Sequence, residues 1–323
     1  MSAGEATAAA AASSHGGGGM ASARQPRRAG LVYGVVTYLI WGVLPLYFVL
    51  MAPTGPVELV AARVIFSVVF CAIIVAVTRR WRHIGALLAD RHVVGPLAVA
   101  ALLIYANWQL YVIAVETAHV LEASLGYFIN PIVTVLLAVI FQHERLTRMQ
   151  WAAVGVSAVA IAVLVVAYGQ VPWIGLGLAL SFGFYGLIKS RVADRVDAIG
   201  GLTVETTLLV PVAIAALVVV EVGMGGLTFA RTGVGHALLL ASTGVVTAVP
   251  LMTFAAASRR LPLSWLGFIQ YLGPTLQFLI GLLVLHEPMP AARLAGFALI
   301  WAAIALLLVD GALQARRAHV PRG

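Results

Sequence analysis

The chain has almost no cysteine and little charge, and these two shortages exclude several classes of protein. Its single cysteine, Cys71, rules out an internal disulfide and a cysteine-rich metal site, and we interpret it as a small buried apolar residue. Only 10% of the 323 residues are charged, whereas 62% are hydrophobic and the mean hydropathy is +1.01. One soluble core cannot bury that much apolar surface, so the sequence predicts a protein that resides in a lipid bilayer.

Enzyme and metal motifs are also missing. The eight histidines are scattered, without an HExxH or paired CxxC spacing. There is no Walker A motif, no GxSxG elbow and no pair of aspartates within an apolar run. The sequence therefore predicts no catalysis, no cofactor, no bound metal and no ATP-driven pumping within this chain.

Apolar runs that are long enough to cross a bilayer occur ten times. A hydrocarbon core about 30 Å thick requires roughly 20 apolar residues in a helix. The runs are 31–51, 57–78, 93–114, 119–141, 150–168, 172–191, 202–222, 235–257, 263–285 and 292–313. Backbone polar groups in lipid must be paired within the segment or in a closed barrel, and continuously apolar stretches such as 132–141 do not fit barrel strands. We expect an all-α integral membrane protein with ten transmembrane helices.

The basic residues lie almost entirely on one side of the predicted membrane. With the N-terminus in the cytoplasm, 17 of the 20 Lys and Arg residues fall in cytoplasmic tails and loops. Arg231 and Arg293 fall outside, and Arg63 lies within a span. By the positive-inside rule, this distribution predicts that both termini are cytoplasmic. The net charge of +8 is thus a topology signal, and we predict no nucleic-acid partner.

The polar segments at the two ends are short. Residues 1–29 are rich in Ala, Gly and Ser and are expected to form a disordered cytoplasmic tail; they lack the apolar core of a secretory signal peptide. Met20 is an alternative start of the protein. Residues 314–323 are expected to form a basic cytoplasmic tail. The loops leave no room for a soluble domain, so any function must be built from the helices.

The second half of the chain repeats the first. The segment LGYFINPIVTVLLAVIFQHE (125–144) matches LGFIQYLGPTLQFLIGLLVLHE (266–287), with Pro131 aligned to Pro274. The sequence therefore predicts two five-helix repeats, residues 30–170 and 171–313. Because five is odd, the second repeat must be inverted in the membrane, an arrangement that supports alternating access to a site near the midplane. The alternative is an ancient duplication that is kept only for packing.

Arg63 is the clearest candidate for a functional residue. An ionisable group within a span costs about 2.5–3.5 kcal/mol on insertion scales, so it requires a partner or a pathway. Glu122, Asn107 and Trp108 lie at a similar depth near the outer end, and we expect Arg63 to pair with Glu122 or with a substrate anion. The alternative is an arginine that only snorkels or braces helices.

The fourth span carries a stripe of small and polar residues. Glu122, Gly126, Asn130 and Thr134 recur at a spacing of four, which places them on one helix face. This face is either a pore lining or a tight seam between helices. Pro131 leaves a carbonyl without its helical hydrogen bond near the membrane middle, and that carbonyl is a potential ligand.

The corresponding polar residues of the second half lie toward the cytoplasmic end. Glu205 and Gln270 are the predicted inner gate, although Glu205 is equally well explained as a boundary carboxylate near a helix start. Glu122 and Glu205 are the two acids that could couple transport to protons. Several aromatic residues could line a cavity for a flat ligand, and the candidates for substrate contact are Trp41, Tyr127 and Tyr271.

Several segments resemble the RarD family of bacterial permeases, in the EamA branch of the drug/metabolite transporter superfamily. They are HVLEASLGYFINPIVTVLLAVIFQHERLTRMQW (119–151), YLIWGVLPLYF (38–48), NWQLYVIAV (107–115) and ALSFGFYGLIK (179–189), together with Glu58 and Arg63. The likeness covers residues 31–313. It implies a ten-helix, two-repeat fold in a bacterial inner or plasma membrane, and family members are commonly labelled chloramphenicol-sensitive or chloramphenicol-resistance permeases. The long N-terminal tail and the Arg-rich, Lys-poor loops depart from the family.

Taken together, these features predict a secondary transporter that exports a small metabolite or an amphipathic drug-like compound. A channel is disfavoured because no polar ring repeats along any span. The competing classes are a membrane scaffold or regulatory subunit and an intramembrane enzyme. A polar cavity that reaches Arg63 would favour transport, and a dry, closed core would favour a scaffold.

Overall fold

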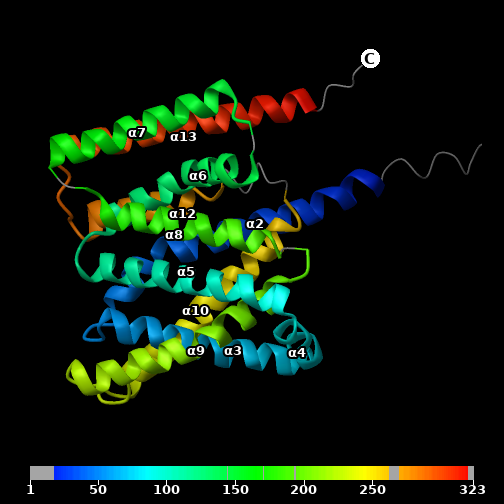
Figure 1. Cartoon of the computed structure of the whole chain (residues 1–323), viewed down its shortest axis with the longest axis vertical. Helices are drawn as coiled ribbons and strands as arrows, with labels where there is room; N and C mark the ends of the chain where they lie inside the picture. Colours follow the sequence, from blue (N-terminus) through cyan, green and yellow to red (C-terminus); the bar gives the residue numbers. More distant parts are fainter. Residues whose placement is uncertain (1–17, 144, 170, 193, 262–268, 319–323) are drawn as a thin grey trace, which may run out of the picture.

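The computed structural model describes residues 18–143, 145–169, 171–192, 194–261 and 269–318. Within these residues every regular element is a helix, and the long helices lie side by side in one bundle (Figure 1). They are α2 (Gly18–Val49), α3 (Pro56–Val77), α4 (Trp81–Ala89), α5 (Arg91–Glu116), α6 (Val120–Gln142), α7 (Arg148–Tyr168), α8 (Trp173–Ser190), α9 (Ala198–Gly223), α10 (Val234–Ser258), α12 (Leu272–Leu279), the π-helix η1 (Ile280–Val284) and α13 (Ala291–Ala318). The all-α fold expected from the sequence is confirmed.

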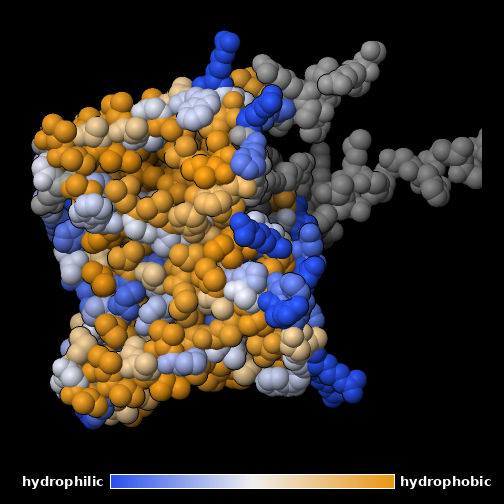
Figure 2. Space-filling model, viewed as in Figure 1, coloured by the Kyte–Doolittle hydropathy of each residue, from blue (hydrophilic) through white to orange (hydrophobic). Residues whose placement is uncertain are grey.

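The helices have the length and composition of membrane spans. In the described part of the chain, nine helices are long and apolar enough to cross a bilayer. The ninth expected span, 263–285, is present as the shorter apolar stretch Leu272–Val284, and residues 262–268 lie outside the described part. Figure 2 shows apolar residues over most of the visible side of the bundle and strongly hydrophilic residues gathered at one end. The ten-helix membrane architecture is therefore confirmed.

One expectation about the polar segments is wrong. The disordered tail predicted for residues 1–29 does not extend to residue 29, because α2 already begins at Gly18; residues 1–17 lie outside the described part. Ala, Arg, Gln and Met, which favour helix, make up most of residues 20–29 and carry the first span beyond its apolar run. Within the segment 314–323, for which only a basic cytoplasmic tail was predicted, helix α13 continues as far as Ala318, and residues 319–323 lie outside the described part.

A short helix follows the second span, in a segment that was expected from the sequence to be a loop. This helix, α4, has nine residues and is too short to span a bilayer. It lies at the same end of the bundle as the start of α2 and the end of α13 (Figure 1). We call this end the basic end, because Arg79 and Arg80 directly precede α4 and Arg82 lies within it.

The two halves of the chain, α2–α7 and α8–α13, make corresponding helix contacts with each other. In the first half, α6 and α5 both pack on α8; in the second half, α12 and α10 both pack on α2. Helix α3 packs on both α9 and α10, and α7 pairs with α13 along one edge of the bundle (Figure 1). Each half therefore supplies its first span as the surface on which the other half packs.

Two close helix contacts show the same correspondence between the halves for individual residues. A Cβ atom on Gly42 would lie 2.7 Å from the Leu276 side chain, so α2 and α12 touch at this glycine. A Cβ atom on Gly183 would lie 2.9 Å from the Val133 side chain, so α8 and α6 touch in the same way. Gly42 aligns with Gly183 and Val133 aligns with Leu276 in the sequence repeat, so aligned residues make the corresponding contacts.

The helical segments after Pro131 and Pro274 are both followed by a histidine with a left-handed backbone conformation. His143, the C-cap of α6, has a left-handed φ of 55°, and its aligned residue His286 has a φ of 53°. A positive φ is uncommon for a residue other than glycine. The repeat is therefore present in backbone conformation as well as in sequence.

Candidate functional site

Arg63 is buried where α3 meets α10. The residue is 5% exposed, and its Nε donates a hydrogen bond of 2.7 Å to Oγ1 of Thr247. This bond joins the first half of the chain to the second. Among the described residues no carboxylate lies within 4.0 Å of its guanidinium. The charge must therefore be compensated by other groups.

Aromatic rings supply that compensation. The guanidinium carbon lies 4.3 Å from the ring centroid of Trp108 and 5.7 Å from that of Phe48. Tyr111 packs edge-on against Phe48, and Tyr127 packs edge-on against Tyr111. A cation–π contact contributes about 0.5–2 kcal/mol, so two such contacts and one hydrogen bond are comparable with the cost of inserting the charge. We call Arg63, Phe48, Trp108, Tyr111 and Tyr127 the Arg63 cage.

Polar groups without partners occur in the cage and one helical turn away from Arg63. Within the described part of the chain, Nε is the only guanidinium nitrogen of Arg63 with a hydrogen-bond acceptor. The hydroxyl of Tyr111 and that of Ser67, one helical turn from Arg63, are buried and have no partner. Buried polar groups in proteins are nearly always hydrogen-bonded. The cage therefore combines net positive charge with unused hydrogen-bonding capacity.

Asn107 connects the cage to α8. Its side-chain nitrogen donates to the carbonyl of Leu178 and to Oγ of Ser181, each at 3.0 Å. Its oxygen accepts a hydrogen bond of 3.3 Å from the hydroxyl of Tyr127. The structure thus places Trp108 against Arg63 directly, and it links Asn107 to the cage through Tyr127.

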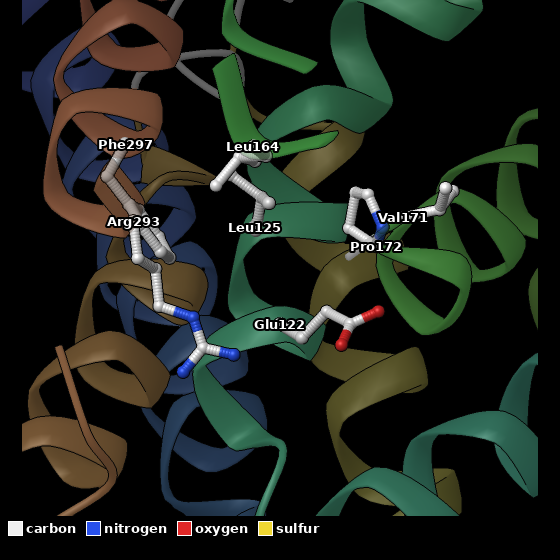
Figure 3. Close-up of a pocket in the computed structure, with 7 residues that line it drawn as sticks. All are labelled: Glu122, Leu125, Leu164, Val171, Pro172, Arg293 and Phe297. Atoms are coloured by element: carbon white, nitrogen blue, oxygen red, sulfur yellow. The ribbon is translucent and has the colours of Figure 1, made fainter. Parts of the chain in front are cut away.

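The expected pairing of Arg63 with Glu122 is not found. Oε1 of Glu122 instead accepts backbone N–H bonds from Ile174 at 2.8 Å and Gly175 at 3.3 Å. These groups belong to the first turn of α8, where unpaired N–H groups and the helix dipole favour a carboxylate. Figure 3 shows the Glu122 side chain extending on the side of Pro172 and Val171, away from Arg293. Glu122 therefore anchors a helix start.

Two pockets open beside Glu122. One lies between Glu122 and Arg293 and is otherwise lined by apolar side chains, as Figure 3 shows; the lining residues are Leu125, Leu164, Val171, Pro172 and Phe297. The other has a volume of about 400 Å³ and is lined by His119, Glu122, Val171, Trp173 and Ile174. Neither is lined by a residue of the Arg63 cage. With Arg63 only 5% exposed, the cage is closed in this conformation.

A second charged cluster lies toward the basic end of the bundle. Glu205 in α9 is 3% exposed, and its Oε1 lies 2.9 Å from Nζ of Lys189 in α8. Tyr185 donates a hydrogen bond of 3.3 Å to Glu205 and accepts one of 2.6 Å from Lys189. Glu205 is therefore a buried, paired carboxylate seven residues after the start of α9, and its interpretation as a boundary carboxylate near the helix start does not fit this position.

Sequence relatives identify the group of proteins to which this chain is similar. The EamA-like transporter family matches residues 28–166. A protein named RarD from Streptomyces exfoliatus is 46% identical over 92% of this chain and 93% of its own length. The protein named RarD from Escherichia coli is 40% identical over 91% of this chain and 98% of its own length.

The chain belongs to the RarD family. Another relative, named chloramphenicol-sensitive protein RarD, from Pseudomonas aeruginosa, is 30% identical over 89% of this chain and 96% of its own length. A solved structure titled "Crystal structure of protein" superposes with a TM-score of 0.57 and 20% identity, covering 91% of this chain and all of that one, which shows a shared fold. As a RarD family member, the chain is a multi-pass bacterial membrane protein and a transporter of the drug/metabolite type.

Four further residues of this RarD family member were predicted to belong to the site. The Oδ1 atom of Asn130 is buried without a partner in α6, and Gln270 is half-buried just before α12. Tyr271 stacks on Phe128 with ring centroids 6.3 Å apart. Trp41 packs against other aromatic rings of α2 and α10, and its carbonyl accepts a bond from Gln277. Their roles in transport remain predictions.

Two carboxylates whose role was not predicted from the sequence fasten this RarD family protein at the end opposite the basic end. Glu58 is 2% exposed and binds the backbone of Thr228 and Phe229. Glu287 is 4% exposed, and its two oxygens accept the N–H groups of Val120 and Leu121 at 2.5 and 2.9 Å. Both sit at the ends of apolar runs, where a carboxylate is normally solvated. Only their partners in space show that they are buried.

Proposed function

We propose that the protein is a secondary active transporter that exports a small metabolite or an amphipathic drug-like compound by alternating access. In this proposal the repeats 30–170 and 171–313 move relative to each other. Each contact that helices of one repeat make with the first span of the other has a counterpart in the opposite direction. Such a relationship supports two alternative closures around one site, because a contact made at one end has a counterpart at the other.

A single observation carries the proposal. The buried cation of Arg63, from the first half, is held by aromatic rings and by Thr247 of the second half, with no described carboxylate beside it. A structural arginine at such depth is expected to pair with an acid of the protein. An unpaired arginine at the contact between the halves is instead suited to a ligand that enters from outside the chain.

The proposal includes two gates. The outer gate comprises Arg63, Asn107, Trp108 and Glu122, and the inner gate comprises Glu205 and Gln270. Both termini lie in the cytoplasm, as the distribution of basic residues favours, and the basic end of the bundle then faces the cytoplasm of the inner or plasma membrane. Glu122 and Glu205 are the candidates for proton coupling, and coupling predicts that flux depends on a pH gradient.

Counterflow in proteoliposomes tests the proposal. Purified protein is loaded with unlabelled compound and assayed for uptake of the labelled compound, using amino acids, small metabolites and aromatic drugs, including chloramphenicol because one relative is named after it. We expect Arg63→Ala and Glu122→Gln to abolish counterflow while the protein stays folded in detergent. Normal flux in both variants would contradict the assignment of the outer gate.

A non-transporting scaffold or regulatory subunit is the second candidate. The observation that favours it is the closed core around Arg63, since neither described pocket is lined by the cage. A scaffold predicts no counterflow of any compound and no change in the exposure of Trp108 when ligands are added. Ligand-dependent quenching of Trp108 fluorescence would speak against it.

A further inference from the structure

We propose that the Arg63 cage binds the carboxylate of a small organic acid with an aromatic or apolar body. This inference rests on the proposed transport function and adds the chemical class of its substrate. It follows from a comparison of the cage with the equivalent place in the second half of the same chain.

Arg63 and Glu205 occupy the same position in the second span of their halves. Arg63 lies seven residues after Pro56, which begins α3, and Glu205 lies seven residues after Ala198, which begins α9. Both residues are buried. The two halves therefore place charges of opposite sign at equivalent sites near opposite ends of the bundle.

The residues that face these two charges are also equivalent. Phe48 lies six residues after Gly42 in α2, and Lys189 lies six residues after Gly183 in α8, where the two glycines make corresponding contacts. In the second half, Lys189 neutralises Glu205 at 2.9 Å. In the first half, the position of this counter-ion is taken by Phe48, whose ring lies 5.7 Å from the Arg63 guanidinium. The first half thus retains the charge without a counter-ion of its own.

The groups in the cage match a carboxylate in geometry and charge. The terminal nitrogens of an arginine form a planar fork that matches the two oxygens of a carboxylate. The unpartnered hydroxyl of Tyr111 can donate a further bond to the same group. The rings of Trp108 and Phe48 flank the guanidinium, so an aromatic or apolar body attached to the carboxylate would find apolar contact there.

Binding is measured on the purified full-length protein with phenylacetate, its neutral amide phenylacetamide, and sodium chloride at equal ionic strength. The readouts are the thermal unfolding midpoint and the fluorescence of Trp108, isolated by comparison with Trp108→Phe. We expect phenylacetate to raise the midpoint and quench Trp108, and phenylacetamide to bind about tenfold more weakly or not at all. Equal shifts with the amide, or a chloride shift as large as that of phenylacetate, would overturn the carboxylate assignment.

Substitutions of Phe48 test the missing counter-ion without removing Arg63. Phe48→Glu should supply the carboxylate from the chain itself, as Lys189 supplies the ammonium for Glu205, and abolish phenylacetate binding in a folded protein. Phe48→Leu is the comparison that removes the ring without adding charge: phenylacetate should bind more weakly than to the natural protein, because an apolar contact is lost, but still more tightly than its amide. Arg63→Gln should lose that preference. A Phe48→Glu protein that binds phenylacetate as the natural protein does would contradict the proposal.

The experiments can contradict the organic-acid proposal and the transport proposal independently. If counterflow is observed only with neutral compounds and persists in Phe48→Glu, the transport proposal stands and the organic-acid proposal falls. If phenylacetate binds as expected but no compound shows counterflow, the cage is an anion site on a protein that does not transport it, and the proposed function falls.

Discussion

Glu58 accepts the backbone N–H of Thr228 on both of its carboxylate oxygens, at 2.9 Å each. The same carboxylate accepts the N–H of Phe229 at 2.8 Å and the hydroxyl of Thr228 at 3.1 Å. Glu58 lies in the first turn of α3 in the first half, and Thr228 lies between α9 and α10 in the second. This carboxylate therefore fastens the two halves at the end opposite the basic end.

Glu58→Gln should loosen that contact. The amide replaces one accepting oxygen with an NH2 donor, which would face backbone donors and leave at least one of them buried without a partner. We expect a loss of about 1–3 kcal/mol in the free energy of unfolding, visible as a lower thermal midpoint. Glu221→Gln is the control: Glu221 is exposed, bonds to Arg231 in a surface pair, and should cost little. Equal midpoints for the two variants would contradict the buried contact.

Gly126→Ala should disrupt the seam between α6 and α8. A Cβ atom on Gly126 would lie 2.5 Å from the backbone oxygen of Gly175, and backbone cannot move aside as a flexible side chain can. We expect a destabilisation of about 1–3 kcal/mol or loss of folded protein, measured by thermal unfolding and size-exclusion chromatography. Gly155→Ala in α7 is the control, because a Cβ there meets nothing within 4 Å. A Gly126→Ala protein as stable as Gly155→Ala would show that the helices are not in contact.

Lys189→Met should destabilise the protein more than the removal of both members of its ion pair. The single change leaves the buried carboxylate of Glu205 without its cation, which costs about 3 kcal/mol for a pair of which one member is partly exposed. Lys189→Met combined with Glu205→Leu removes both charges and should recover most of the loss. The test is a double-mutant cycle on unfolding free energies, and additive effects of the two changes would show that the pair does not form.

Asp197→Asn should reduce stability only where the carboxylate of Asp197 is ionised. Burial opposes its ionisation, but hydrogen bonds from Arg80 at 2.7 Å and His83 at 3.0 Å outweigh burial and hold the pKa of the Asp197 carboxyl below its ordinary value. A carboxyl with a lower pKa in the folded state contributes its full stability above the unfolded pKa of about 3.9 and loses it as the pH falls through the folded pKa.

The expected stability difference between the natural protein and Asp197→Asn at neutral pH is below about 1 kcal/mol, because the pair is partly exposed. This difference should close as the pH falls below about 4. Thermal midpoints measured across this range check the prediction, and Arg80→Gln should show the same trend. A difference that stays constant through the acid range would contradict the ion pair.

Some features of the site could be predicted from sequence and others could not. Arg63 stands out in sequence because a charge within an apolar run is costly wherever the run packs. Its neighbour Trp108 was expected nearby because both lie at the same depth. The partner of Glu122 was not predictable, since the N–H groups of Ile174 and Gly175 come beside it only through the packing of α6 on α8.

The sequence by itself determined the number of spans, because each apolar run must satisfy its own backbone in lipid and so forms a helix whatever its neighbours do. It also showed the internal repeat, since aligned residues such as Pro131 and Pro274 are visible without coordinates. Only the tertiary structure decided which charges are paired: Glu205 has Lys189, whereas Arg63 has aromatic rings and Thr247. The reason is physical, because ion pairs and cation–π contacts act over a few ångströms between helices, and that distance is set by packing.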